Sequence, residues 1–240
     1  MSGTSAGTSA DPAEIKRFNR LAKDWWNQAG PMRPLHRMNA LRVRWIDEHI
    51  RSHIGEPAGL PLLDVGCGAG LASEALARLG YAVLGIDPSL PLIAAAEAHA
   101  AERGLAIRYR VALPETLAAE MLQFRAVTAL EVVEHVADPA AFLAVLASLL
   151  APGGVLFLST INRTLSSLLV AKLGAEYVLR LLPPGTHDWK RFLPPVEMDR
   201  LLIKSGLRLA DLAGMTFDPL RQSWRESRDL SVNYILMATG

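Results

Sequence analysis

One stretch, residues 62–70 with the sequence LLDVGCGAG, constrains the fold of this chain more than any other. Its first four residues are apolar apart from Asp64, which predicts a short buried strand. The turn after that strand holds three glycines, Gly66, Gly68 and Gly70. Glycines let the backbone turn tightly and let a ligand approach the main chain. Apolar residues at helical spacing follow over 71–79 and Gly80 ends them. Strand, glycine turn and helix in this order predict a nucleotide-binding βαβ unit.

The spacing and the flanking carboxylates indicate which nucleotide binds. The glycines read G-x-G-x-G, and Leu71 stands where the dinucleotide fingerprint would have its third glycine. Asp64 would repel a pyrophosphate and attract an ammonium group. Asp87 ends the next predicted strand, where a carboxylate accepts both ribose hydroxyls. S-adenosylmethionine has no phosphate and carries an amino-acid end, so we predict it as the cofactor, contacted by Asp64, the three glycines and Asp87.

Composition narrows the class of protein. At 240 residues, half of them hydrophobic, the chain suits one α/β domain with a large core. A formal net charge of +1 implies no broad attraction to nucleic acid. The single Cys67 cannot form an internal disulfide, which favours a reducing cytoplasm. Residues 1–10 lack a basic start and an apolar core, so we expect no signal peptide, and we interpret residues 1–11 as a disordered tail.

Alternating elements predict a mostly parallel, doubly wound sheet within one domain spanning 12–240, with an N-terminal helical cap. The basic segment 31–39 is expected to be a loop, and the last two strands to be antiparallel. Trp25-Trp26 is interpreted as packing, with contact to the substrate as the alternative. The expected helices are 12–25, 40–50, 71–79, 88–103, 139–150 and 195–204, and the expected strands are 62–65, 81–86, 107–111, 126–130, 155–160, 207–212 and 234–238.

A cluster of polar residues follows the strand 126–130. Glu131, Glu134 and His135 stand at i, i+3 and i+4, which places them on one face if the turn is helical. Two carboxylates and an imidazole beside a cofactor could hold a divalent metal or take a proton from a substrate. The alternative is that His135 packs locally while the glutamates are solvated.

An unusually apolar segment spans residues 168–182. Its only charges, Lys172, Glu176 and Arg180, lie four residues apart and form one narrow polar stripe. So wide an apolar face indicates burial in a core, contact with lipid, or a channel for a greasy substrate. We therefore expect an inserted apolar helix at about 165–190. The turn behind it carries His187, a second candidate base.

With these residues in place, the chain resembles the class I S-adenosylmethionine-dependent methyltransferases, and more closely the O-methyltransferases of ubiquinone biosynthesis. The resemblance covers residues 12–240 and implies the Rossmann-like fold of that class, with an antiparallel last strand. It rests on WW at 25–26, PLHRMN at 34–39, LDVGCG at 63–68, EVVEHVADP at 131–139, STINR at 159–163, GAEY at 174–177, PGTHD at 184–188 and VNY at 232–234.

The resemblance implies cofactor contacts at Arg42, Gly66, Asp87 and Leu130, the last of which is often methionine in relatives. It also implies magnesium, which some relatives are thought to bind through residues matching Glu131, Glu134 and His135. The implied substrates are two polyprenylated catechol-type molecules, a 2-polyprenyl-6-hydroxyphenol and a 3-demethylubiquinol. A long prenyl tail would explain the apolar segment 168–182, and implies peripheral contact with the inner face of the membrane and with other proteins of the quinone pathway.

The expected chemistry is an in-line displacement in which the enzyme positions the phenol against the methyl group. A phenol with a pKa near ~10 needs a base or a metal to become phenolate at neutral pH. His135, or the metal that it would hold, is the first candidate and His187 the second, and Glu131 is expected to be a further catalytic residue. Two other functions stay open: methylation of another small phenolic substrate, and a non-catalytic cofactor-binding scaffold at a membrane.

Overall fold

The computed structural model describes residues 12–30, 32–164, 192–218, 221 and 223–240. The predicted tail at 1–11, the apolar segment 168–182 and His187 lie outside the described residues. Within the described part of the chain, no helix is long and apolar enough to cross a membrane.

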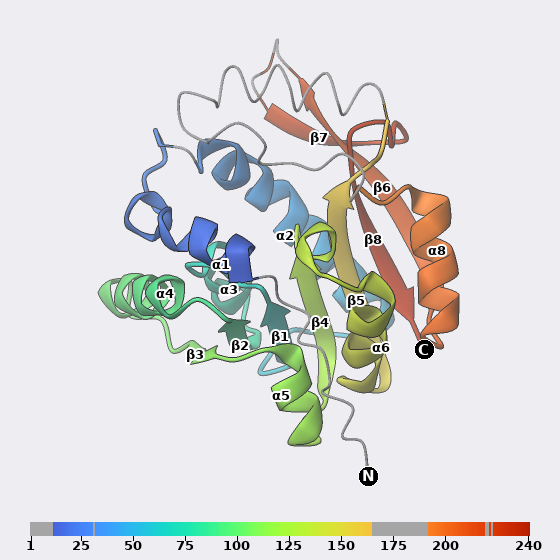
Figure 1. The fold of residues 1–240 in the computed structure, drawn as a ribbon, viewed down its shortest axis with the longest axis horizontal. Coiled ribbons are helices and arrows are strands. Elements are labelled where there is room, and N and C mark those ends of the chain that lie inside the picture. Colours follow the sequence, from blue (N-terminus) through green and yellow to red (C-terminus); the bar gives the residue numbers. More distant parts are fainter. Residues whose placement is uncertain (1–11, 31, 165–191, 219–220, 222) are drawn as a thin grey trace.

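The described strands form one eight-stranded sheet in the order β3-β2-β1-β4-β5-β8-β6-β7 (Figure 1). Neighbours from β3 to β5 are parallel, and β8 lies antiparallel between β5 and β6. The predicted mixed sheet is thereby confirmed. The strand order reverses between β1 and β4, which is where open sheets of this kind bind ligands at the carboxyl ends of their strands. The strands are β1 (Pro61–Val65), β2 (Ala82–Asp87), β3 (Arg108–Val111), β4 (Phe124–Leu130), β5 (Leu150–Ile161), β6 (Arg208–Asp218), β7 (Ser223–Ser227) and β8 (Asn233–Thr239).

Helices cover both faces of the sheet. The helices are α1 (Pro12–Asn19), α2 (Arg33–His53), α3 (Leu71–Arg78), α4 (Leu90–Glu102), α5 (Pro114–Ala119), α6 (Pro139–Ser148) and α8 (Pro195–Lys204), with short 3-10 turns η1 (Ala22–Asp24) and η2 (Val133–His135). One apolar core joins the sheet to α5, α6 and α8, and a second joins its other face to α2 and α3.

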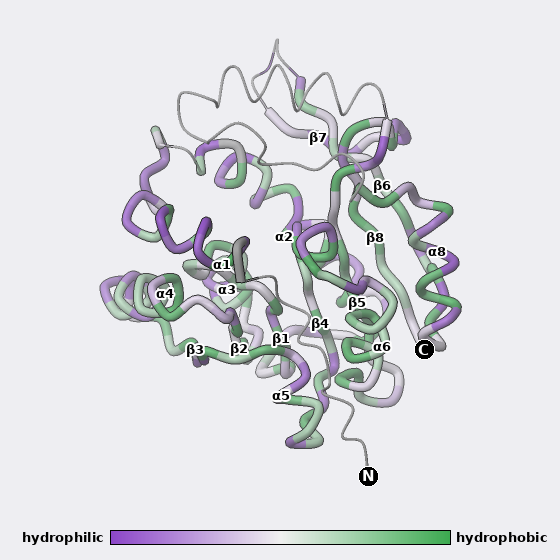
Figure 2. Tube along the Cα trace, viewed as in Figure 1, coloured by the Kyte–Doolittle hydropathy of each residue, from purple (hydrophilic) through white to green (hydrophobic). Residues whose placement is uncertain are grey.

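Neighbouring residues of the central strands point alternately into these two cores. In β5, Leu156 belongs to the first core and Phe157 to the second, and both are fully buried. A strand buried on both faces is apolar along most of its length. In Figure 2, β8 is mainly green, whereas α4 and α8 mix green and purple.

Helix α2 differs from the prediction. It begins at Arg33, so the expected loop at 31–39 is wrong, and it runs for 21 residues. Pro34 falls at the start of the helix, where a missing N–H costs no hydrogen bond. Proline and basic residues favour a loop, but Met38 and Leu41 begin an apolar stripe that packs into the second core. This stripe is the signal for a helix.

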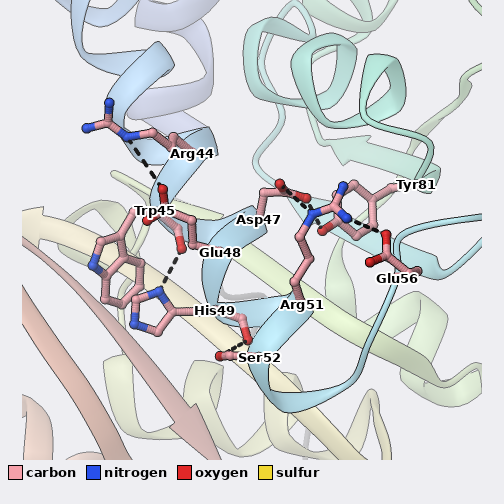
Figure 3. Close-up of polar contacts among 9 residues, drawn as sticks. All are labelled: Arg44, Trp45, Asp47, Glu48, His49, Arg51, Ser52, Glu56 and Tyr81. Carbon is pink, nitrogen blue, oxygen red and sulfur yellow. Dashed lines mark hydrogen bonds and ion pairs between the residues drawn. The ribbon is translucent and has the colours of Figure 1, made fainter.

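Polar contacts fix α2 to its surroundings (Figure 3). The Tyr81 hydroxyl donates to Asp47 at 2.7 Å. The His49 ring stacks on Trp45 with centroids 3.7 Å apart, and its Nε2 lies 2.8 Å from a carboxylate oxygen of Asp211 on β6. These contacts hold α2 as a fixed support for Arg42 on its inner side.

Three further differences concern the first helix, a short helix in the middle of the chain and the edge of the sheet. The first helix stops at Asn19 and a 3-10 turn follows, so the predicted continuous helix over 12–25 is wrong. The short helix α5 and the edge strand β7 were not predicted. β7 has the sequence SWRES, whose polar residues lack the apolar alternation that reveals a strand.

Candidate active site

The glycine turn after β1 is built as the spacing predicts. Gly66 and Gly68 have φ of 68° and 55°, in the left-handed region that favours glycine. The backbone of Gly66 is also crowded: an added Cβ would lie 2.5 Å from a methyl group of Val132. The segment after β4 therefore packs directly on the turn. Gly70, with φ of 88°, leads into α3.

Asp64 is buried at the end of β1. The Ser73 hydroxyl donates to one carboxylate oxygen at 2.6 Å and the Thr128 hydroxyl to the other at 2.8 Å. Burial raises the pKa of Asp64, although both hydroxyl hydrogen bonds lower it. The side chain thus joins β1 to α3 and β4, and its predicted contact with the ammonium group of the cofactor stays a prediction.

Asp87 lies at the carboxyl end of β2, against the glycine turn. The backbone N–H of Gly68 donates to its Oδ2 at 3.0 Å and that of Ser89 to its Oδ1 at 2.9 Å. Burial, with the charge of Asp64, raises the pKa of Asp87 to about 6, while these two hydrogen bonds lower it. A carboxylate has about four acceptor positions, so two remain for incoming hydroxyl donors.

Glu131 gathers donors from three elements. It is a non-glycine residue with φ of 56°, a conformation that costs about 1–3 kcal/mol. Its Oε1 accepts from Ser159 Oγ at 2.9 Å and Asn233 Nδ2 at 3.1 Å, and forms an ion pair with Arg42 Nη2. Sequence reasoning missed Ser159 and Asn233, because only the pairing of β5 with β8 brings them beside β4. Leu130, directly before Glu131, packs against the core that α2 covers.

Glu134 is buried and accepts a hydrogen bond from Thr160 Oγ1 at 2.9 Å. Burial and the charge of Glu131 raise its pKa, against a smaller lowering by His135. This carboxylate therefore faces β5, where its donor Thr160 follows Ser159, a donor to Glu131.

His135 is held by the N-terminal helix. Its Nδ1 lies 3.0 Å from Glu14 Oε2, and the Phe18 ring meets the imidazole edge-on with centroids 5.4 Å apart. Burial lowers the pKa of His135, but the hydrogen bond with Glu14 and the charges of Glu134 and Glu14 outweigh it, so the pKa is raised. With Nδ1–H donated to a carboxylate, a neutral ring presents Nε2 as an acceptor. The sequence analysis did not assign Glu14 to the site.

The three residues predicted to bind a metal, Glu131, Glu134 and His135, do not form one cluster. Among the described residues, no group of three or more His, Cys, Asp and Glu side chains is placed to hold a metal ion. Glu131 has left-handed φ and η2 begins only at Val133, so Glu131, Glu134 and His135 do not share the helical face that their spacing predicted. The magnesium site expected on these three residues therefore stays a prediction, which the arrangement of the described side chains does not support.

Comparisons with known proteins identify the family. A family model described as a methyltransferase domain matches residues 35–212. The ubiquinone biosynthesis O-methyltransferase of Parvibaculum lavamentivorans is 48% identical, over 97% of this chain and 95% of the relative. That of Caulobacter vibrioides is 46% identical, over 96% and 95%. This chain belongs to the family of ubiquinone biosynthesis O-methyltransferases. It is an S-adenosylmethionine-dependent O-methyltransferase, as the resemblance implied.

Solved structures bear out the class I fold of this methyltransferase. The magnesium protoporphyrin IX methyltransferase from Synechocystis PCC 6803 with bound SAM superimposes with a TM-score of 0.65 at 22% identity, covering 98% of this chain and 99% of that one. The plantazolicin methyltransferase with bound SAH gives the same TM-score at 14% identity. Both structures hold the cofactor or its product, which agrees with the predicted S-adenosylmethionine.

Proposed function

We propose that this methyltransferase transfers a methyl group from S-adenosylmethionine to a phenolic oxygen of polyprenylated catechols. The two substrates are a 2-polyprenyl-6-hydroxyphenol and a 3-demethylubiquinol. The observation that carries the chemistry is the Glu14–His135 pair, which follows the carboxyl end of β4 in the segment whose Val132 packs on Gly66. The relatives' name supports the pathway, and the resemblance to their family supports the two substrates.

In the proposed reaction, His135 Nε2 takes the phenol proton as the oxygen attacks the methyl carbon. The new O–C bond forms as the S–C bond breaks, and S-adenosylhomocysteine leaves as a neutral thioether. Glu14 holds the ring by its Nδ1 and stabilises the imidazolium that results. The contact of His135 with Glu14 uses Nδ1, which leaves Nε2 as the nitrogen proposed to face the substrate. His187, outside the described residues, remains the second candidate base.

We propose that the cofactor lies at the carboxyl ends of β1 and β4, where the strand order of the sheet reverses. Asp87 receives the ribose hydroxyls, the backbone at Gly66, Gly68 and Gly70 lies along the ligand, and Leu130 faces the adenine. Arg42 and Asp64 are proposed to contact the amino-acid end. The burial of Asp87 and its two remaining acceptor positions support its role.

The proposed methyl transfer uses no metal ion. Glu131 pairs with Arg42, Glu134 accepts from Thr160 and His135 contacts Glu14, and among the described residues these three side chains form no group placed to hold an ion. Glu131 instead neutralises the buried Arg42, and Glu134 is hydrogen-bonded to β5.

We also propose that the methyltransferase works at a membrane surface, on the inner face, with residues 168–182 lying along the lipid. The sequence supports this, because three charges on one stripe leave the remaining circumference apolar. The substrate's prenyl tail would itself reside in the lipid. Other proteins of the quinone pathway are proposed as further partners.

The decisive experiment is an assay of His135→Gln on a short-tailed catechol. We expect turnover to fall by about 10²–10⁴-fold, because the phenol loses its base. The affinity for S-adenosylhomocysteine, measured by calorimetry, should stay within about twofold. The matched control is His53→Gln, an exposed histidine at the end of α2, which should keep full turnover.

Exhaustive chelation should leave wild-type turnover unchanged. Loss of turnover on chelation, restored by magnesium, would contradict the direct role of His135. Wild-type protein that binds S-adenosylhomocysteine but methylates no catechol would contradict the proposed substrate class.

A further inference from the structure

The connection between α1 and α2 lies on the glycine turn through two consecutive tryptophans. Trp26 donates its indole N–H to the carbonyl oxygen of Ala69 at 3.0 Å. Its ring stacks on His99 of α4 at 3.5 Å between centroids, with the planes 8° apart. The Trp26 indole N–H therefore has a hydrogen-bond acceptor within the chain, and its ring is stacked.

Trp25 differs from its neighbour. Its side chain is 7% exposed and packs with Met32, Ala69 and Leu92. Its buried Nε1 has no hydrogen-bond partner among the described residues. A buried N–H without an acceptor is rare in folded proteins, because the group has lost its hydrogen bonds to water. This donor therefore calls for an acceptor that the described chain does not supply.

The unpartnered donor lies at the glycine turn. A Cβ added to Gly68 would lie 2.5 Å from Cζ2 of Trp25 and 3.2 Å from Cε2, the atom bonded to Nε1. The benzo edge of the indole thus lies against Gly68, with Nε1 one bond beyond Cε2, and the N–H of Gly68 itself donates to Asp87. Gly68 therefore contacts both Asp87, a residue of the proposed cofactor site, and the ring of Trp25.

We propose that Trp25 is a cofactor-binding residue, whose indole N–H donates to the carboxylate of bound S-adenosylmethionine. The inference rests on the cofactor site proposed above. The ribose hydroxyls are donors and are matched by Asp87, an acceptor. An N–H requires an acceptor, and the carboxylate is the single anionic group of this cofactor, which makes the stronger type of hydrogen bond.

The test separates the carboxylate from the rest of the ligand. Trp25→Phe keeps an aromatic ring on Gly68 and removes the N–H. Calorimetry compares S-adenosylhomocysteine with 5′-methylthioadenosine, which keeps the adenosine and lacks the amino-acid end. We expect the affinity for S-adenosylhomocysteine to fall by about tenfold or more and that for 5′-methylthioadenosine to change by less than about twofold.

Trp26→Phe is the matched control. Its N–H is bonded within the chain, so its removal should affect both ligands equally and lower the melting temperature. Equal weakening of both ligands by Trp25→Phe, or no weakening of either, would overturn the proposal. Wild-type protein that binds neither ligand would overturn the cofactor site itself.

A measurement on wild-type protein does not depend on how the variant folds. The chain has five tryptophans, whose indole N–H resonances can be followed by ¹H–¹⁵N NMR. The Trp25 resonance should shift on addition of S-adenosylhomocysteine and stay in place with 5′-methylthioadenosine. A Trp25 resonance that responds identically to both ligands would contradict a bond to the carboxylate.

Discussion

Asp87 combines burial with a role that requires charge. The pKa of this carboxyl is raised to about 6 from 3.8, first by burial. Because the folded-state pKa is raised, ionisation of Asp87 opposes folding of the ligand-free protein as the pH rises from about 4 to about 6. Ribose hydroxyls that donate to Asp87 favour the ionised form, so a bound cofactor would return the pKa toward its ordinary value.

This linkage predicts how binding depends on pH. The affinity for S-adenosylhomocysteine should fall as the pH drops through about 6, since Asp87 must lose a proton to bind. Asp87→Asn should weaken binding at pH 7.5 by about tenfold or more and flatten the profile, apart from any contribution of the buried Asp64. Calorimetry between pH 5 and 8 measures both. An unchanged slope in the variant would assign the pH dependence to another group.

At the scale of elements, the site is assembled from segments that are remote in sequence. Helix α1 supplies Glu14, the segment after β4 supplies His135, and α2 supplies Arg42. In Figure 1, α1 lies beside the carboxyl ends of β1 and β2. The N-terminal cap is therefore part of the catalytic machinery as we propose it, and its removal should affect turnover as well as stability.

The apolar segment 168–182 carries a prediction of its own. Leu169→Glu combined with Leu173→Glu should abolish co-sedimentation with phosphatidylglycerol-containing liposomes, because two charges would have to enter the lipid interface. Activity on a long-tailed substrate should fall with it, while activity on a short-tailed analogue stays. Leu90→Glu, at a leucine that is 66% exposed on α4, is the control and should change neither. Wild-type protein that stays in the supernatant, or a double variant that unfolds, would indicate a buried segment.

At the scale of the whole molecule, stability depends on a sheet buried on both faces. Phe157 is fully buried on β5, and its ring meets that of Trp45 edge-on with centroids 6.0 Å apart. Phe157→Ala should cost about 3–5 kcal/mol of unfolding free energy in a urea titration, since the cavity lies between β5 and α2. Ile203→Ala, at a residue 60% exposed on α8, should cost less than about 0.5 kcal/mol. Similar costs for both would mean that the second core contributes little.

The sequence by itself determined the features that depend on neighbouring residues. Local spacing predicts three features: the glycine turn, Asp87 at a strand end, and the alternation of strands and helices. The structure confirms all three. The parallel order of the first five strands also follows, because short helical connections leave few alternatives.

Tertiary structure alone decided which side chains meet. Glu131 has a left-handed φ, and Arg42, Ser159 and Asn233 converge on its carboxylate, so it does not share a helical face with Glu134 and His135. A spacing of i, i+3 and i+4 predicts one face only if the backbone is helical, and long-range contacts set that backbone. The contact of Glu14 with His135 and that of Trp25 with Gly68 likewise join remote segments. No local pattern encodes such contacts, because their free energy arises from packing that exists only once the chain has folded.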